Sequence, residues 1–315
     1  MTQIDDGNTD RKTHLHKGQK IAKWDVREKL GEGSFGDVYL VKNSAGASFA
    51  MKTEKIDDNP SALKIEVYVL TNLSRMNSTH FCKIEDCGTF SNFRYIVMTL
   101  VGPSLQELRR KNSSEKFSMG TALSVGVKCV GAIEELQSLM GVLHRDIKPG
   151  NFAIGDPNKR QIYLIDFGMA RQFLDSEGKI LPPRLSVGFR GTFRYASISC
   201  HIARELCRKD DLESWLYMQI EFTRGRLPWK DLKTQDEVCQ LKQRCRDDDK
   251  LNELFGGCPQ EYVEIMRYLE TVQYTDKPDY SKLKLFNKLK YRIMAQRFFG
   301  VETEKMKFGT VIAVL

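Results

Sequence analysis

Alternating hydrophobic and polar residues dominate the first third of the chain, and this alternation is typical of half-buried strands. Two such runs, at 37–41 and 48–52, flank the turn-rich stretch 43–46, whose sequence is Asn-Ser-Ala-Gly. Tight turns favour Asn and Gly, so the spacing predicts a β-hairpin. A further apolar run at 93–100 predicts another strand.

A helix is expected between these strands. Asn59 is a good N-cap residue and Pro60 suits the first helical position, so the helix is predicted to begin there and to run to about residue 75. The segment 24–101 is therefore predicted to be mostly β with one helix.

The pattern changes after Gly102 and Pro103. Apolar residues recur on one helical face over 119–140, and the segment 211–224 is apolar on most sides, which is typical of a buried helix. The rest of the chain to about residue 299 is predicted to be mostly helical. The fold class is therefore expected to be α+β, with a small, mostly β part followed by a larger, mostly helical part.

With 315 residues, of which 41% are hydrophobic and 29% charged, the chain has the composition of a soluble globular protein. No apolar run approaches the roughly 20 residues that a membrane helix needs, and the polar N-terminus lacks an apolar signal core. The eight cysteines include no Cys-x-x-Cys pair and are expected to be free thiols. We therefore expect a cytoplasmic protein, with the nucleus as a second location and no membrane partner.

The formal net charge of +8 favours acidic or phosphorylated protein partners, although most Lys and Arg side chains are expected to belong to a solvated surface. The sequence has no RNP-type aromatic motif or zinc-finger spacing, so nucleic acid is not expected as the main ligand. No coiled coil or other dimer seam is predicted, and we expect a monomer.

The stretch 31–38 reads Gly-Glu-Gly-Ser-Phe-Gly-Asp-Val and fits a G-x-G-x-x-G-x-V pattern. In a dinucleotide-binding turn such glycines lead into a helix, but here an alternating strand follows them. Placed between two strands, Gly31, Gly33 and Gly36 would let backbone N–H groups approach ATP phosphates without a side-chain clash. A purely structural hairpin is the alternative for this segment.

Ala50 and Lys52 share one face of the next predicted strand, since alternate strand residues point the same way. Ala50 is small enough for a flat purine to lie against it, and Lys52 can reach the phosphates beyond. Glu66 is the only acid on the predicted helix and is the natural partner of Lys52. The alternative is a pair of unrelated surface charges, which contribute about 0–1 kcal/mol.

The octet 144–151 reads His-Arg-Asp-Ile-Lys-Pro-Gly-Asn and fits H-R-D-x-x-x-x-N. It places a carboxylate, an ammonium and a carboxamide on one loop, and phosphoryl transfer needs such groups. Asp146 is expected to align a hydroxyl or accept its proton, and Lys148 to steady the γ-phosphate. Asn151 and Asp166, the latter opening an Asp-Phe-Gly after a short apolar strand, are the two oxygen ligands expected for Mg²⁺.

Together these residues resemble the eukaryotic protein kinase superfamily over roughly residues 24–300. The stretch 191–198, Gly-Thr-Phe-Arg-Tyr-Ala-Ser-Ile, stands where most kinases have Ala-Pro-Glu. With Lys-Pro-Gly-Asn-Phe at 148–152 and Asp-Lys-Pro-Asp-Tyr at 276–280, it resembles the casein kinase 1 superfamily. Within that group the sequence looks closest to the tau-tubulin kinase-like branch.

The resemblance implies a bilobal, protein kinase-like α+β fold that uses ATP and Mg²⁺. It divides the chain into a flexible tail at 1–20, a kinase domain with an N-lobe at 21–101 and a C-lobe at 102–300, and a C-terminal tail at 301–315.

The resemblance also assigns an adenine site and a structural brace. Met98 would be the gatekeeper, and the backbone of Leu100 and Val101 would hydrogen-bond the adenine. Asp211, at the head of the buried helix, would brace the catalytic loop. The slot around the nucleotide would be lined by Leu30, Val38, Ala50 and Ile165.

One departure from the family pattern bears on substrates. The stretch after Pro228 and Trp229 is mixed in charge, whereas many casein kinases carry a basic cluster there, which argues against a strong need for substrates phosphorylated upstream. Arg184, Arg190 and Arg194 still offer an anion site near the activation segment, because guanidinium forks suit phosphate. Bracing of that segment against the C-lobe is the alternative role of Arg194.

The function implied is a non-specific serine/threonine protein kinase that acts on protein hydroxyls, with Lys148 favouring Ser/Thr over Tyr acceptors. We expect constitutive activity and a preference for acidic or phosphorylated substrates. A pseudokinase scaffold that binds nucleotide without efficient transfer is the main alternative. It should lack part of a catalytic set that is complete here: Lys52, Glu66, Asp146, Asn151 and Asp166. A small-molecule kinase and a dinucleotide-dependent oxidoreductase fit the motifs less well.

Overall fold

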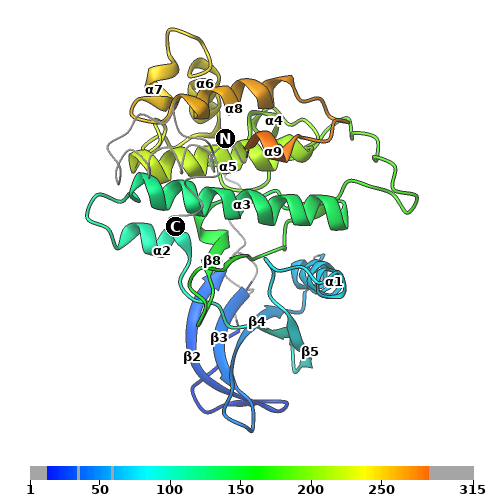
Figure 1. Cartoon of the computed structure of the whole chain (residues 1–315). Coiled ribbons are helices and arrows are strands. Elements are labelled where there is room, and N and C mark those ends of the chain that lie inside the picture. Colours follow the sequence, from blue (N-terminus) through cyan, green and yellow to red (C-terminus); the bar gives the residue numbers. More distant parts are fainter. Residues whose placement is uncertain (1–12, 34–35, 58–59, 284–315) are drawn as a thin grey trace, which may run out of the picture. The chain divides into compact units, whose positions relative to one another are not determined.

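The computed structural model describes residues 13–33, 36–57 and 60–283, and it divides into two compact units. The first unit comprises the chain up to Pro103 together with Ala153–Ala170, and the second comprises Ser104–Phe152 together with the chain from Arg171 onward. Figure 1 shows a sheet in the first unit and helices in the second. The predicted α+β class is thus confirmed, although Ala153–Ala170 belongs to the sheet unit despite following the predicted boundary at 101–102.

Within the described residues, the first unit holds a six-stranded antiparallel sheet in the order β1-β2-β3-β4-β6-β5. Its strands are β1 (Lys20–Ile21), β2 (Trp24–Gly33), β3 (Gly36–Lys42), β4 (Ser48–Lys55), β5 (Ile84–Phe90) and β6 (Phe93–Met98). The predicted hairpin is confirmed as β3–β4, and its turn is closed by hydrogen bonds from Asn43 N to Ala47 O (3.1 Å) and from Gly46 N to Asn43 O (3.0 Å). A short ladder pairs β8 (Phe152–Ile154) with β9 (Ile162–Leu164).

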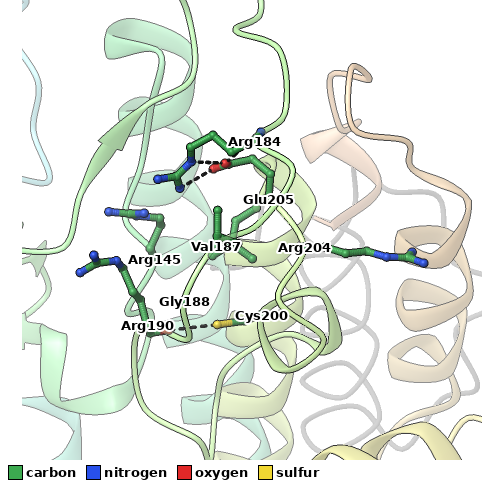
Figure 2. Close-up of a pocket in the computed structure, with 9 residues that line it drawn as sticks. Arg145, Arg184, Val187, Gly188, Arg190, Cys200, Arg204 and Glu205 are labelled. Atoms are coloured by element: carbon green, nitrogen blue, oxygen red, sulfur yellow. Dashed lines mark hydrogen bonds and ion pairs between the residues drawn. The ribbon is translucent and has the colours of Figure 1, made fainter.

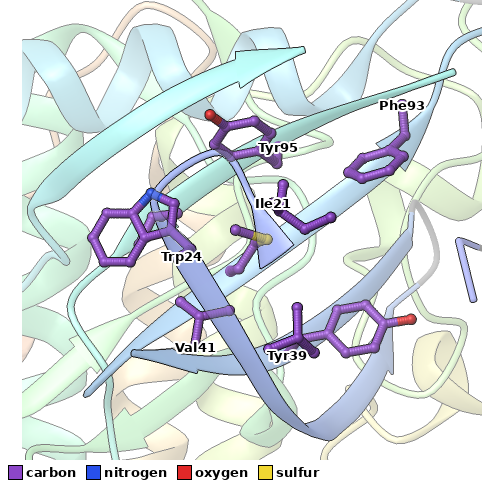
Figure 3. Packing of buried hydrophobic residues seen from close by; sticks show 9 residues of the cluster. Ile21, Trp24, Tyr39, Val41, Phe93 and Tyr95 are labelled. Carbon is purple, nitrogen blue, oxygen red and sulfur yellow. The ribbon is translucent and has the colours of Figure 1, made fainter. Parts of the chain in front are cut away.

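One hydrophobic cluster covers one face of this sheet, as Figure 3 shows. The buried members are Ile21, Trp24, Val26, Tyr39, Val41, Met51, Phe93, Tyr95 and Val97. Because strand residues alternate between faces, Ala50 and Lys52 on either side of Met51 point to the opposite face. Burial of the cluster fixes the register of the strands, and the register fixes which residues line the other face.

Leu15 packs against this cluster and Thr13 is buried, so the flexible tail predicted for 1–20 is wrong at these positions. The Tyr39 hydroxyl donates a hydrogen bond to the carbonyl oxygen of Thr13 and accepts one from the N–H of Leu15 at 3.2 Å. Leu15 itself contacts the hydrophobic cluster. Residues 1–12 lie outside the described part of the chain.

The helix of the first unit is α1 (Ala62–Arg75), and it begins later than predicted. Ser61 is its N-cap and accepts a hydrogen bond from Lys64 N at 3.1 Å. The start predicted at Pro60 is therefore wrong, and Asn59, the predicted N-cap, lies outside the described residues. Ser and Asn are both good N-caps, so the sequence alone did not distinguish the two positions.

A buried carboxylate ties α1 to the sheet. Glu54 on β4 accepts hydrogen bonds from the first N–H groups of the helix, those of Ala62 (2.9 Å) and Leu63 (3.2 Å). A negative charge at a helix N-terminus is stabilised by the helix dipole. This contact holds the start of α1 against the same strand that carries Lys52.

The second unit is helical. Its elements are α2 (Leu105–Arg110), α3 (Met119–Met140), β7 (Val142–Leu143), the 3₁₀ turn η1 (Pro149–Asn151), β10 (Arg171–Gln172), α4 (Ile198–His201), α5 (Arg208–Arg224), α6 (Gln235–Arg244), α7 (Leu251–Phe255), α8 (Gln260–Thr271) and α9 (Tyr280–Leu283). The predicted helix 119–140 is confirmed as α3, and α5 begins at Arg208 rather than at Asp211.

The helices α3 and α5 lie side by side in this unit (Figure 1). The indole N–H of Trp215 on α5 donates to the carbonyl of Gly126 on α3 at 3.1 Å, and nearly every residue of α5 is buried. The helix ends at Gly225, whose positive φ of 89° suits a helix stop. Among the helices of the described residues, none is long and apolar enough to cross a membrane. The helical stretch predicted beyond residue 283 and the tail at 301–315 lie outside those residues.

Candidate active site

In the first unit, a buried lysine lies between two carboxylates. The Nζ atom of Lys52 on β4 lies 2.6 Å from Glu66 Oε2 on α1 and 2.9 Å from Asp166 Oδ1. Burial disfavours the ammonium, but Asp166 and Glu66 outweigh burial and raise the pKa of Lys52 above its ordinary value. The structure thus brings the predicted Lys52 and Glu66 together as a buried pair, and the alternative of two unrelated surface charges is wrong.

The register of the sheet groups two of the residues predicted to line the adenine slot, Val38 and Ala50, with Lys52 and the predicted gatekeeper Met98. Val38 on β3 is opposite Lys52 on β4, and Ala50 is opposite Met98 on β6. These four residues therefore share the face that the hydrophobic cluster does not occupy. Leu30 on β2 is 47% exposed, which leaves its side chain available for an external contact.

The connection that leaves β6 contains Leu100 and Val101, whose backbone is predicted to hydrogen-bond the adenine. Neither Leu100 nor Val101 uses its main-chain N–H or C=O in a hydrogen bond to another described residue, whereas the flanking residues do. Thr99 N donates to Lys83 O at 3.0 Å, and Gly102 N donates to Ile154 O at 2.8 Å. The backbone between these two anchors offers a donor and an acceptor to a flat heteroaromatic ligand.

Gly36 shows why the glycine-rich stretch cannot carry side chains throughout. Its φ is +154°, and a Cβ atom added there would lie 1.7 Å from the carbonyl oxygen of Thr53 on β4. Gly31, in contrast, has open space around the position of a Cβ. Ser34 and Phe35, at the tip of this stretch, lie outside the described residues.

In the second unit, the catalytic loop between β7 and η1 holds one carboxylate on several sides. Asp146 Oδ2 accepts a hydrogen bond from Lys148 Nζ at 2.7 Å, and Asp146 Oδ1 accepts one from the Thr192 hydroxyl at 3.0 Å. The side-chain amide of Asn151 donates to the main-chain oxygen of Asp146 at 2.8 Å and to its Oδ2 at 3.2 Å. Asp146, Lys148 and Asn151 are therefore brought together as predicted.

Asp211 at the start of α5 supports this loop from behind. Its carboxylate accepts hydrogen bonds from the main-chain N–H groups of His144 and Arg145, both at 2.9 Å, and from the Gln137 side chain at 3.0 Å. Asp211 is 3% exposed, so these three donors replace the water that it loses. The geometry is that of the brace implied by the family resemblance.

Two motif residues adopt backbone conformations that non-glycine residues rarely adopt. Arg145 has a φ of 67° and Asp166 a φ of 66°. Such conformations cost about 1–2 kcal/mol each and persist where the surrounding contacts determine them, which is common at functional sites.

Asp166 in the first unit carries a carboxylate and Asn151 in the second carries an amide oxygen, and each by itself is a donor of the kind that Mg²⁺ takes. The amide nitrogen of Asn151 is committed to Asp146, so its oxygen is the atom offered to an ion. A carboxylate and an amide oxygen are hard ligands of the kind that Mg²⁺ prefers, with waters and phosphate oxygens as its remaining ligands.

The three arginines predicted as an anion site do not line a single pocket. Arg184 and Arg190 line a small pocket with Arg145 and Arg204, shown in Figure 2, whereas Arg194 lines another. Arg184 is committed to Glu205, to which it donates from Nε and, at 3.0 Å, from a terminal nitrogen.

Arg145 and Arg190 are two further cations that line this pocket. In Figure 2 their guanidinium groups project to the same side, while Arg204 points away. Burial, and then the positive charges of Arg190, Arg171 and Arg184, lower the pKa of Arg145 to about 10. A site where guanidinium groups repel one another is one where a bound anion is stabilised.

Arg194 has the bracing geometry that was its alternative role. One guanidinium nitrogen lies 3.5 Å from Oε1 of the buried Glu221 on α5, and another lies 3.5 Å from the carbonyl of Lys230. The side chain still lines the second pocket, so both roles are open to it.

Sequence reasoning gave no role to two residues of this site. Thr192 belongs to the quoted stretch 191–198, and its hydroxyl donates to Asp146 and accepts from Lys148 at 3.3 Å. Arg145 was quoted in the octet without a function. Gly191 marks the place where the segment of Thr192 approaches the catalytic loop closely. Its φ is +101°, and a Cβ atom added there would lie 2.8 Å from the carbonyl oxygen of Arg145.

Comparisons with known proteins agree with this geometry. The protein kinase domain family matches residues 24–278. The chain is 42% identical over 261 residues to a Dictyostelium discoideum protein named as a probable serine/threonine-protein kinase, a match that covers 82% of this chain and 51% of that protein. It is 38% identical over 267 residues to serine/threonine-protein kinase spe-6 of Caenorhabditis elegans, covering 83% of this chain and 70% of the relative.

The chain spans about half the length of the Dictyostelium relative. It belongs to the protein kinase family, whose members use ATP and Mg²⁺.

Proposed function

We propose that the chain is an active serine/threonine protein kinase that transfers the γ-phosphoryl group of Mg-ATP to hydroxyl groups of proteins. The observation that carries this proposal is the set of contacts around Asp146, whose two carboxylate oxygens accept from Thr192 and Lys148. A carboxylate held on both oxygens has a fixed orientation, as a residue that aligns a substrate hydroxyl requires.

In the proposed reaction, Asp146 aligns the acceptor hydroxyl and takes its proton, and Lys148 balances the negative charge of the transferred group. Lys52, oriented by Glu66, holds the phosphates of the nucleotide. When bound, Mg-ATP would supply the phosphoryl group and its ion would neutralise the negative charge, and Asp166 and Asn151 are the residues that would hold the ion.

A pocket of about 470 Å³ in the second unit supports a preference for acidic or phosphorylated substrates. Its lining includes Lys148 and Thr192, so it adjoins Asp146. The cationic residues of the lining are Arg110, Lys148, Arg194 and Lys230, and no carboxylate of the described residues lines it. Such a surface attracts negatively charged groups of a protein substrate that lie near the hydroxyl to be phosphorylated.

We further propose a casein kinase 1-like enzyme, closest to the tau-tubulin kinase-like branch, that is active without a phosphate on its activation segment. The contact of Arg184 with Glu205 supports this, because it fixes part of the segment by an internal ion pair. Phosphatase-treated recombinant protein should therefore phosphorylate casein. Constitutive activity would be refuted if that protein were inert and became active after phosphorylation of residues in the segment 166–196.

A pseudokinase scaffold is the second candidate function. It would bind nucleotide through Lys52 and the glycine-rich stretch and would not transfer phosphate efficiently. The contacts of Asp146 with Lys148, Thr192 and Asn151 favour the enzyme, since a scaffold has no need for an oriented carboxylate in this loop.

The deciding assay combines the protein with labelled ATP, Mg²⁺ and casein or tubulin. Asp166→Asn and Lys52→Met should abolish transfer, whereas Lys64→Met, an exposed lysine on α1, should retain it. Transfer that is lost only in the first two variants supports the enzyme. Nucleotide binding by the wild type without any transfer would instead support the scaffold.

A further inference from the structure

The segment Phe193–Ile198 is held by buried charges that belong to other elements. It follows Thr192, which binds Asp146, and its first three residues line the pocket of about 470 Å³ beside Lys148. The position of this segment therefore sets the shape of the surface that a protein substrate would contact.

Lys242 on α6 makes the most unusual of these contacts. Its side chain is fully buried, and Nζ donates hydrogen bonds to the carbonyl oxygens of Phe193 (2.8 Å) and Ala196 (2.6 Å). The third direction of the ammonium is taken by Nε2 of His201 at 3.1 Å. Nζ also lies 4.8 Å from the ring centroid of Tyr217.

The ammonium of Lys242 forms no ion pair with a carboxylate of the described residues. Burial of an ammonium group is unfavourable in free energy unless each of its N–H groups donates a hydrogen bond. Here two carbonyls and an imidazole use the three N–H groups, and the ring faces of Tyr217 and Trp229 (5.1 Å) add favourable cation–π contacts. Both carbonyls belong to the segment, so the gain from burying this charge depends on where the segment lies.

Two buried glutamates of α5 hold the same segment from another side. Glu221 accepts a hydrogen bond from the Tyr195 hydroxyl at 2.6 Å, and Glu213 accepts one from the main-chain N–H of Ile198 at 2.8 Å. Glu213 is itself paired with Arg246 at 2.8 Å. The segment is thus held at Tyr195 and at Ile198, in addition to the contacts of its carbonyls with Lys242.

We infer that Lys242 is a positioning residue for the protein substrate: it fixes the substrate-facing wall at 193–196 through two main-chain carbonyls, without a phosphate on the segment. This inference rests on the proposed kinase function and adds a residue that touches neither nucleotide nor phosphate. Removal of the ammonium leaves two buried carbonyls without donors, which favours another conformation of the wall.

The test is the variant Lys242→Met, which keeps the length and apolar character of the side chain and removes its donors. We expect the KM for casein to rise by about tenfold to a hundredfold, from the loss of donors to two buried carbonyls. The KM for ATP and the slow hydrolysis of ATP by water should be unchanged, since neither depends on the wall. Arg244→Met, which removes an exposed cation from the same helix, should leave all three quantities unchanged.

Tyr195→Phe provides a second variant that removes one hydroxyl with little change in volume. It should raise the KM for casein by a few-fold without affecting the KM for ATP. Thermal unfolding of each variant shows whether it is folded, and Tyr195→Phe decides the matter if Lys242→Met does not fold. An unchanged KM for casein, or an equal loss of casein phosphorylation and ATP hydrolysis, would overturn the inference. A wild type that transfers nothing to casein would instead refute the proposed function.

Discussion

Lys52 Nζ on β4 lies 2.6 Å from Glu66 Oε2 on α1, so this contact joins a strand to the helix that follows it in the sequence. Both side chains are almost fully buried, at 5% and 1% exposure. Such a pair is stable only while both charges are present, because removal of either leaves an uncompensated buried charge. The orientation of Lys52 is therefore determined by the position of α1, which Glu54 fixes to the same strand.

Lys52→Met should reduce phosphate transfer by about a hundredfold or more, because a preorganised charge is lost from the phosphate site. It should also lower the free energy of unfolding by about 3–5 kcal/mol, since Glu66 and Asp166 lose their shared counterion. Steady-state kinetics and urea titration measure the two effects. Lys64→Met is the matched control, and equal behaviour of the two variants would show that the buried pair has no special role.

Asp211→Asn should lower the free energy of unfolding by about 2 kcal/mol or more. Three N–H groups donate to the Asp211 carboxylate, from the side chain of Gln137 and the main chain of His144 and Arg145. The asparagine side chain can still accept through its oxygen, but its NH₂ group would face at least one of these donors and leave that donor without an acceptor. The catalytic loop should become more mobile, and kcat should fall while the KM for ATP changes little. Asp236→Asn, at an exposed position of α6, serves as control. An unchanged kcat would show that Asp211 does not brace the loop.

The sequence predicted those parts of the site whose residues are close together in the chain or alternate along a strand. The octet 144–151 fixed Asp146, Lys148 and Asn151 on one loop, and strand alternation placed Ala50 and Lys52 on one face. The α+β class followed from the change of period after Pro103.

Contacts between side chains distant in sequence could not be predicted. Glu205 takes Arg184 out of the predicted anion site, and no sequence pattern marks a pairing between residues 21 positions apart that belong to different segments. No sequence pattern marks Lys242 and Glu213 as buried charges that hold a segment of another element. Their burial depends on how α5 and α6 pack around the segment 193–198, and this packing produces no periodic pattern of hydrophobic residues in the sequence.

Arg190→Gln should weaken the preference for peptides that carry phosphoserine, because Arg190 and Arg145 line the cationic pocket. We expect a loss of about tenfold in kcat/KM for phosphorylated peptides, the value of a charge-assisted hydrogen bond or two, with no change for unphosphorylated ones. Arg204→Gln is a suitable control, since its guanidinium points away from the pocket (Figure 2). Equal rates of the wild type on both peptide sets would remove the proposed anion preference altogether.

The free energy of unfolding should decrease as the pH falls from about 6.5 to about 4 because of His201. Burial, and then the charge of Lys242, lower the pKa of His201 from 6.5 to about 4. In this window the unfolded chain binds a proton at His201 and the folded chain does not, so protonation favours unfolding by up to about 2–3 kcal/mol. Lys242, whose pKa burial lowers to about 7, is largely charged in both states below about pH 6 and adds to the slope only near the upper end of the window.

His201→Gln isolates this contribution, since the glutamine oxygen can still accept from Lys242 and does not titrate between these pH values. Urea titrations at several pH values should show a slope for the variant that is shallower than that of the wild type, with the difference confined to the range between about 4 and 6.5. His14→Gln, at an exposed position, should retain the slope of the wild type. Parallel curves for the wild type and His201→Gln would mean that His201 is protonated in the folded chain as easily as in the unfolded one, and that its buried contact with Lys242 does not persist in solution.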